Sequence, residues 1–166
     1  GGLWKTTDNG TTWNTNTDLL PNLGVSGIAI DPINPDTMYL ATGDRDGGDT
    51  YSIGVLKSTD GGTSWKPTGL TLQPTNYARL TGIVIHPNQT QHLVVSSRSG
   101  IYRTTNGGTS WTLVSNQNTN DMEFKPGDPN TVYASGNNFR VSTNGGATFT
   151  QITAGLPSTG FQRGAI

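Results

Sequence analysis

One eight-residue pattern occurs four times in this chain of 166 residues, and it limits the possible folds more than any other feature. Its clearest copy is Ser-Thr-Asp-Gly-Gly-Thr-Ser-Trp at residues 58–65, and the others lie at residues 6–13, 104–111 and 142–149. A supersecondary unit copied at such intervals cannot bury its apolar face alone and must stack on its neighbours. The chain is therefore expected to be an array of similar units.

Each copy of the pattern predicts the tip of a β-hairpin, because Asp-Gly, Asn-Gly and Gly-Gly supply the positive φ angles that tight turns require. The Asp or Asn oxygen should accept N–H bonds within its own turn, and the closing aromatic should pack beneath it. The acceptors are Asp8, Asp60, Asn106 and Asn144, and the aromatics are Trp13, Trp65, Trp111 and Phe149. Since two acceptors are amides, we expect a structural role that needs an oxygen but no charge.

Between the copies, short runs rich in β-branched and aromatic residues predict three successive sets of four strands. The expected strands are 25–30, 37–42, 54–58 and 65–68; 80–85, 92–97, 100–104 and 111–114; and 121–124, 131–134, 139–142 and 149–152. A further pair, residues 3–7 and 11–14, surrounds the first copy. Radial repetition of four-stranded antiparallel sheets predicts an all-β propeller segment.

The repeats divide the chain into a partial blade (1–20), three complete blades (21–70, 71–117 and 118–157) and the start of another blade (158–166), all within one incomplete propeller domain. Propellers close with about four to eight blades. We therefore expect residues 3–7 and 161–166 to pair with strands from outside this segment. The partner would be either the remainder of a longer chain or a second copy.

Composition excludes several classes of function. Ten Lys and Arg residues stand against eleven Asp and Glu residues, so no strong field would attract nucleic acid. The absence of cysteine excludes disulfides, thiolate zinc sites and cysteine nucleophiles. No apolar run is long enough to span a bilayer. Abundant Thr, Ser, Asn and Gly residues are typical of secreted β-proteins, so a secreted or cell-surface location is expected.

Two blades carry extra residues, and both insertions should emerge on the same face of the propeller. One lies in residues 43–53, between the second and third strands of its blade, and the other in residues 71–79, between two blades. Loops of variable length are where binding residues concentrate. Candidate ligand-binding residues there are Tyr51, Tyr77, Arg79 and Arg98, which would suit a sugar ring or a protein partner. The alternative is that the tyrosines pack their own loops.

The first insertion also holds three carboxylates, Asp44, Asp46 and Asp49, among glycines. Closely spaced oxygen ligands on a flexible loop suit Ca²⁺, although the spacing is not that of an EF-hand. The alternative is a solvated acidic loop that Arg45 partly neutralises. No other cofactor is indicated.

The two histidines do not indicate a catalytic triad. His86 occupies the turn position held by Asp31 and Lys125 in the other blades, each directly before a proline. Nothing in the pattern brings His86 or His92 to a candidate nucleophile.

The repeated pattern resembles the Asp-box of BNR-type β-propellers, a class that includes sialidases, sortilin-type receptor domains and xyloglucan-hydrolysing double propellers. Residues 48–65 are most similar to Asp-box propellers of large multidomain proteins secreted by Bacteroidota. In this class the Asp-box lies on the outer hairpin of a blade, away from the ligand face. The resemblance therefore implies a structural role for the motif.

The same resemblance leaves two functions open. Sialidases use an arginine cluster and a tyrosine nucleophile with a glutamate partner, whereas this chain has one glutamate, Glu123. Xyloglucan hydrolases pair two acids across a cleft between propellers. Residues 31–35 and 39–43 resemble repeats of that family. The residues that follow, Asp-Arg-Asp at 44–46, depart from the pattern where a catalytic segment would have to be recognised. We expect a noncatalytic binding or structural module for glycan or protein. The alternative is a fragment of a polysaccharide hydrolase whose catalytic acids lie partly outside this segment.

Overall fold

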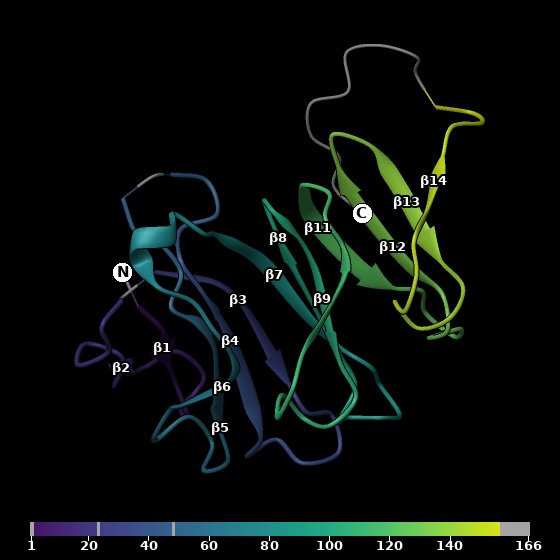
Figure 1. Ribbon diagram of the computed structural model, residues 1–166. Coiled ribbons are helices and arrows are strands. Elements are labelled where there is room, and N and C mark those ends of the chain that lie inside the picture. Colours follow the sequence, from purple (N-terminus) through teal and green to yellow (C-terminus); the bar gives the residue numbers. More distant parts are fainter. Residues whose placement is uncertain (1, 23, 48, 157–166) are drawn as a thin grey trace.

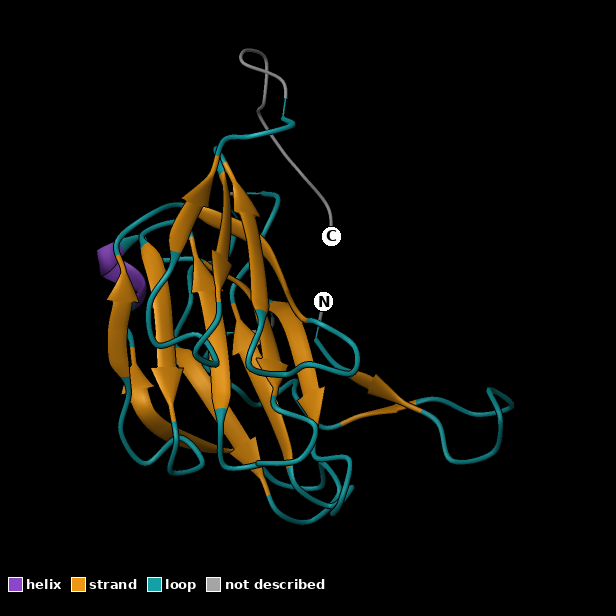
Figure 2. Cartoon of the chain, turned by 90° about the vertical axis from the view of Figure 1, so that its right-hand side faces the viewer, coloured by secondary structure: helices purple, strands orange, loops and turns teal. Residues whose placement is uncertain are grey.

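The computed structural model describes residues 2–22, 24–47 and 49–156, and these form an all-β structure. Figure 2 shows that strands and loops make up nearly the whole chain, with one short helical turn, η1 (Pro74–Asn76). Within these ranges no helix is long and apolar enough to cross a membrane. Residues 158–166, where the start of another blade is expected, lie outside the described residues.

Three four-stranded antiparallel sheets follow one another, each with its strands in chain order. The first blade contains β3 (Val25–Ile30), β4 (Met38–Thr42), β5 (Gly54–Ser58) and β6 (Lys66–Thr71). The second contains β7 (Leu80–Ile85), β8 (Leu93–Ser97), β9 (Gly100–Thr104) and β10 (Thr112–Ser115). The third contains β11 (Thr119–Phe124), β12 (Val132–Gly136), β13 (Phe139–Ser142) and β14 (Thr150–Ile152). The N-terminal hairpin pairs β1 (Trp4–Lys5) with β2 (Asn14–Thr15). The predicted class of fold is confirmed.

The first strands of the three blades, β3, β7 and β11, lie side by side at the centre of the assembly, as Figure 1 shows. Glycine allows the closest of these approaches. A Cβ atom on Gly27 would lie 3.2 Å from the Gly82 Cα atom. A larger side chain at this position would therefore push β3 and β7 apart. The small residue in β3 thus lets the inner strands of two blades meet.

Apolar side chains fill the space between successive blades. One core cluster joins the first and second blades, and its fully buried members include Tyr39, Val55, Leu80 and Val95. A second cluster joins the second and third blades around Val94, Ile101, Met122 and Ala134. The blades are therefore held together by burial of apolar surface, as in any repeat array whose units cannot fold alone.

The Asp-box hairpins and the turns between the first two strands of each blade share one end of the structure. In each blade the amide of the first box glycine donates to a carbonyl of that turn: Gly61 to Asp36 at 2.9 Å, Gly107 to Gln91 at 2.8 Å, and Gly145 to Asn130 at 2.7 Å. The long loops after β4 and β6 are left at the opposite end.

Within each box, the side-chain oxygen closes the turn by accepting several hydrogen bonds. The Asp60 carboxylate accepts the Ser64 amide at 2.9 Å, the Ser64 hydroxyl at 2.6 Å and the Ser58 hydroxyl at 2.7 Å. Ser58 is buried and also accepts the Gly62 amide at 2.8 Å. Hydrogen bonds from the Ser64 side chain and backbone, then from Ser58, lower the pKa of Asp60 to about 2. Equivalent bonds from Thr12 and Thr6 lower the pKa of Asp8 to about 2.

The amide-containing boxes keep the same arrangement with one bond reversed. Asn144 Oδ1 accepts the Thr148 amide at 3.0 Å and the Ser142 hydroxyl at 2.8 Å, while its Nδ2 donates to the Thr148 hydroxyl at 2.9 Å. Asn106 does the same with Ser110 and Thr104. A hydroxyl can donate or accept, so it satisfies either side chain.

A cation from one blade binds the Asp-box of the next. Lys5 Nζ donates to the Gly61 carbonyl at 2.6 Å, Lys57 Nζ to the Gly107 carbonyl at 3.3 Å, and Arg103 Nε to the Gly145 carbonyl at 2.9 Å. The three cations occupy one position, three residues before the acceptor of their own box. The same link therefore recurs at each boundary between neighbouring sheets.

The box aromatics contact the preceding sheet in a matching way. Trp65 Nε1 donates to Asn16 Oδ1 at 3.4 Å, and Trp111 Nε1 donates to Thr68 Oγ1 at 3.3 Å. The third box has Phe149, which offers no N–H group, and Val114 occupies the position equivalent to Thr68. Both apolar residues pack on the second core cluster. Trp13 instead donates to the carbonyl of its own box residue Gly10 at 3.1 Å.

Two buried histidines lie at the boundary between the second and third blades. The rings of His86 and His92 stack with centroids 5.3 Å apart, and both contact the ring of Phe124. His92 Nε2 lies 2.7 Å from the Gly145 carbonyl oxygen and 3.0 Å from Arg103 Nε. Burial, and then the charge of Arg103, lower the pKa of His92 to about 4. The histidines are structural residues of this interface.

We predict that Asp60→Asn unfolds at nearly the same urea concentration as the parent at pH 7, whereas Asp60→Ala unfolds earlier. Asparagine keeps an oxygen for Ser64 and Ser58, and alanine removes it. The ionised Asp60 stabilises the fold above pH 3.8, and this contribution disappears as the pH falls towards 2. The Asn variant has no carboxylate, so its free energy of unfolding should lack this part of the decrease at low pH. An equal loss of stability in both variants at pH 7 would rule out a role for Asp60 as a hydrogen-bond acceptor.

We also predict that His92 makes stability depend on pH between 7 and 5. The pKa of His92 is 6.5 in the unfolded chain but about 4 in the folded chain. The free energy of unfolding should thus fall by about 2 kcal/mol over this range. His92→Gln, which has no proton to gain, should lose most of this dependence in paired urea titrations. An unchanged slope in that variant would contradict the assignment.

Candidate functional site

The two inserted loops meet at the end of the propeller opposite the Asp-boxes. The Ser52 amide donates to the Ala78 carbonyl at 2.8 Å, and the Leu72 amide donates to the Ile53 carbonyl at 3.1 Å. We call residues 43–53 and 72–79, together with Arg98, the loop face. The insertions recognised by their length in the sequence therefore form one surface.

Two tyrosines and an arginine pack together on the loop face. The rings of Tyr51 and Tyr77 meet edge to face, with centroids 5.0 Å apart and an interplanar angle of 88°. The Arg79 guanidinium carbon lies 5.3 Å from the centre of the Tyr51 ring, within cation–π range. The tyrosines do pack their own loops, yet Tyr77 remains 71% exposed. One aromatic surface is thus presented to solvent on a packed base.

The backbone holds Tyr77 in a conformation that side chains seldom adopt. Its φ angle is 55°, in the left-handed region, and it ends η1 with its amide donating to the Pro74 carbonyl at 3.0 Å. For a bulky residue this conformation costs free energy and persists only where surrounding structure imposes it. The loop thus fixes the position of an exposed aromatic ring.

Arg98 connects the loop face to the second blade. Its side-chain Nη2 donates to the Arg45 carbonyl at 3.0 Å, and its amide donates to the Arg79 carbonyl at 3.2 Å. The Arg79 Nε atom is buried and has no hydrogen-bond partner in the described part of the chain. The structure therefore brings all four predicted ligand-binding residues to one surface.

Two of the three carboxylates of the first insertion bind groups of their own loop. Asp44 accepts the Asp46 amide at 3.0 Å, and hydrogen bonds from the Gly47 and then the Asp46 backbone hold its pKa below the usual value. Arg45 Nε lies 3.6 Å from an Asp46 carboxylate oxygen. Across the described ranges no three His, Asp or Glu side chains are grouped so that they could hold a metal ion. Asp44, Asp46 and Asp49 are not grouped as metal ligands in the described ranges, and the calcium site expected there stays a prediction.

Sequence reasoning missed a pair of acids on the inner strand of the third blade. Asp121 and Glu123 line a cavity of about 150 Å³ with Arg45 and residues of β3 and β7. Burial, and then the neighbouring Asp121, raise the pKa of Glu123. The available signal was their spacing of two residues within a predicted strand, which directs both side chains to the same face.

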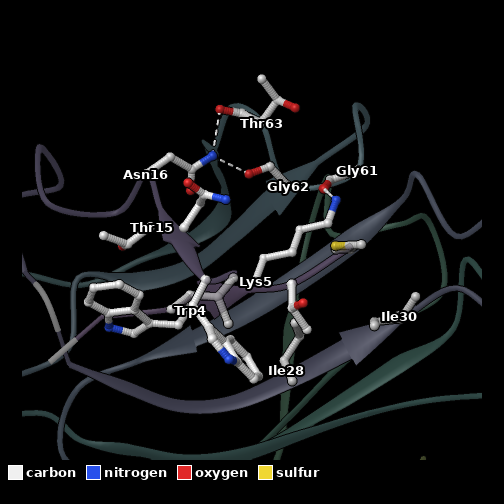
Figure 3. A pocket seen from close by; sticks show the side chains of 14 residues that line it. Trp4, Lys5, Thr15, Asn16, Ile28, Ile30, Gly61, Gly62 and Thr63 are labelled. Atoms are coloured by element: carbon white, nitrogen blue, oxygen red, sulfur yellow. Dashed lines mark hydrogen bonds between the residues drawn. The ribbon is translucent and has the colours of Figure 1, made fainter. Parts of the chain in front are cut away.

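A larger, mainly apolar pocket of about 450 Å³ lies between the N-terminal hairpin and the first blade. Figure 3 shows Trp4 and Lys5 on one side of it and Ile28 and Ile30 on the other. None of these residues was singled out as a site from the sequence.

Comparison with known proteins agrees with this architecture. The model of the family described as Sortilin-Vps10 (sortilin, neurotensin receptor 3) matches residues 1–137. A xyloglucanase of Paenibacillus sp. is 33% identical over 109 residues, which are 61% of this chain and 10% of that protein. Xyloglucanase Xgh74A of Acetivibrio thermocellus is 33% identical over 98 residues, or 55% of this chain and 12% of the relative. The chain thus spans only about a tenth of the curated relatives it matches.

Solved structures show the same fold. The GH74 enzyme of Niastella koreensis superposes with a TM-score of 0.67 at 27% identity, over 93% of this chain and 27% of that one. An ancestral GH74 enzyme superposes with a TM-score of 0.74 at 23% identity, over 93% of this chain and 22% of that one. The resemblance to sortilin-type and xyloglucanase-type propellers is confirmed, and the family model that matches residues 1–137 shows that this chain belongs to the Sortilin-Vps10 family.

Proposed function

We propose that this chain is a noncatalytic, carbohydrate-binding segment of a secreted or cell-surface propeller, and that the loop face holds the sugar. The observation that carries the proposal is the exposed ring of Tyr77, fixed edge to face on Tyr51. A rigid aromatic surface loses little conformational entropy when a ligand stacks on it. The hydroxyl-rich composition supports the location.

The polar groups around this ring suit a neutral ligand rich in hydroxyls. Arg79 lies beside Tyr51 with its Nε atom unpaired among the described residues, and Arg98 lies at the edge of the same surface. Guanidinium groups are donors only and match the hydroxyl and ring oxygens of a sugar. Aromatic faces with a few directed polar groups are the usual composition of ligand sites.

The names of the relatives suggest which carbohydrate to test. Proteins one third identical to this chain over 98 to 109 residues are called xyloglucanases. We therefore propose a branched β-glucan chain of the xyloglucan type as the ligand class, and a xyloglucan oligosaccharide is the first probe.

A second candidate function, a fragment of a polysaccharide hydrolase, is supported by the xyloglucanase relatives and by one observation in the structure. Asp121 and Glu123 share a cavity wall, and the pKa of Glu123 is raised. A carboxylic acid with a raised pKa beside a second carboxyl group is what acid–base hydrolysis of a glycosidic bond requires. Release of reducing sugar that disappears in Glu123→Gln would favour this function over simple binding.

We predict that Tyr77→Ala weakens binding of a xyloglucan oligosaccharide about 3- to 10-fold, because it removes one stacking surface. Isothermal titration calorimetry on the intact chain is the measurement. Trp13→Ala is the matched control, since it removes an exposed aromatic at the Asp-box end, and it should bind as the parent does. Equal affinities for parent and Tyr77→Ala, or no binding by the parent, would overturn the proposed site.

A further inference from the structure

A polar groove of about 500 Å³ lies between the Asp-box hairpins of the first and second blades. β5, β6 and the first box contribute most of its lining residues, and residues 107–109 of the second box contribute the rest. The lining carries two lysines, Lys57 and Lys66, and one carboxylate, Asp60. The groove shares no residue with the loop face or with the inner strands β3, β7 and β11.

The two lysines of this groove face each other across a pair of strands. Lys57 of β5 is directly opposite Lys66 of β6 in the register of the sheet. Directly opposed residues project from the same face of a sheet, and like charges in that arrangement repel each other. Two cations thus share one side of the groove at a cost to the stability of the hairpin.

The repeats show that the fold does not require the second lysine. In every hairpin, the residue six positions after the box acceptor lies opposite the residue three positions before it. The residue after the acceptor is Asn14, Thr112 or Thr150 in the other three hairpins. Uncharged polar side chains are sufficient there, so Lys66 adds a charge for which the packing of the blades gives no reason.

Neither lysine has an ion-pair partner in the described part of the chain. Lys57 Nζ donates to the Gly107 carbonyl at 3.3 Å and lies 5.2 Å from the centre of the Tyr39 ring, so its position is fixed. Lys66 is exposed at the start of β6. Asp60 accepts hydrogen bonds from two serines of its own box. The paired charges therefore have no partner acid within the groove.

Other side chains of the groove can donate hydrogen bonds to a ligand. Thr68 Oγ1 accepts the Trp111 indole N–H and the Leu70 amide, each at 3.3 Å, so its own hydroxyl proton is free for another acceptor. Thr59 adds a second hydroxyl to the lining. Ammonium and hydroxyl donors around an open groove match the oxygens of a carboxylate or a sulfate group, because hydrogen bonds between charged partners are the strong ones.

We propose that this groove binds the carboxylate or sulfate groups of an acidic polysaccharide, with Lys66 and Lys57 as the cations that face them. The Lys57 ammonium has three donors and keeps its bond to the Gly107 carbonyl. That the anionic group is carried by a sugar rests on the proposed function, whereas the preference for an anion follows from the paired lysines. Neutral sugar units bind the loop face, and acidic units bind at the opposite end of the segment.

The test compares three galactose-based oligosaccharides of equal length, one neutral, one made of galacturonic acid and one sulfated. Isothermal titration calorimetry on the intact chain at low salt is the measurement. We expect at least one charged probe to bind more tightly than the neutral one, and the tighter of the two charged probes identifies the group. Lys66→Gln should weaken that binding about 5-fold or more, since it removes a charge-assisted hydrogen bond, and Lys66→Arg should retain it.

A matched variant separates the groove from the net charge of the protein. Lys125→Gln removes an exposed lysine from a turn at the same end of the structure and should bind the charged probe as the parent does. Equal affinity for all three probes, unchanged affinity in Lys66→Gln, or an equal loss in Lys125→Gln would overturn the proposal. A loss in Tyr77→Ala but not in Lys66→Gln would place the acidic ligand at the loop face, which overturns this site but not the proposed function.

Discussion

The arrangement of the blades depends on one carbonyl group in each Asp-box, that of the first glycine. The box turn closes on its Asp or Asn oxygen, and Gly61, Gly107 and Gly145 adopt the positive φ that this turn requires. There it meets a cation from the preceding sheet at every boundary. The apolar clusters supply most of the free energy between blades, but they are non-directional. The charged hydrogen bond, accompanied at two of the three boundaries by an indole contact, sets the register in which one blade lies on the next.

The strands and their end-to-end arrangement could be predicted from the sequence because both depend on local signals. Turn residues and alternating apolar runs placed β3, β5, β7, β9 and β13 at their observed bounds, and the box pattern placed the hairpins at one end. The links between blades could not be predicted. Lys57 and Gly107 are 50 residues apart, so the position of the cation before its own box does not reveal which carbonyl it binds.

The candidate site shows the same limit. Loop length correctly indicated where Tyr51, Tyr77, Arg79 and Arg98 gather, because insertions follow the strand order. The acids at residues 44, 46 and 49 suggested a metal site from composition alone, and the structure adds that Asp44 accepts the Asp46 amide within its own loop. The cavity shared by Asp121, Glu123 and Arg45 was not predicted, because it depends on how the first and third blades pack on the second. One end of the structure is thus fixed by repeated hydrogen bonds, and the other carries the variable loops.

The cation–carbonyl link sets the register of each blade on the next, and amide hydrogen exchange in Lys57→Met tests this role directly. Methionine keeps the stem of the side chain but cannot bind the Gly107 carbonyl. We expect faster exchange at the amides of Gly69, which donates to the Gly108 carbonyl, and of Gly108 itself, with Gly146 unchanged. Lys66→Met, which removes the exposed lysine opposite Lys57 on β6, should alter neither. Unchanged protection at Gly69 and Gly108, or an equal loss at Gly146, would contradict the account.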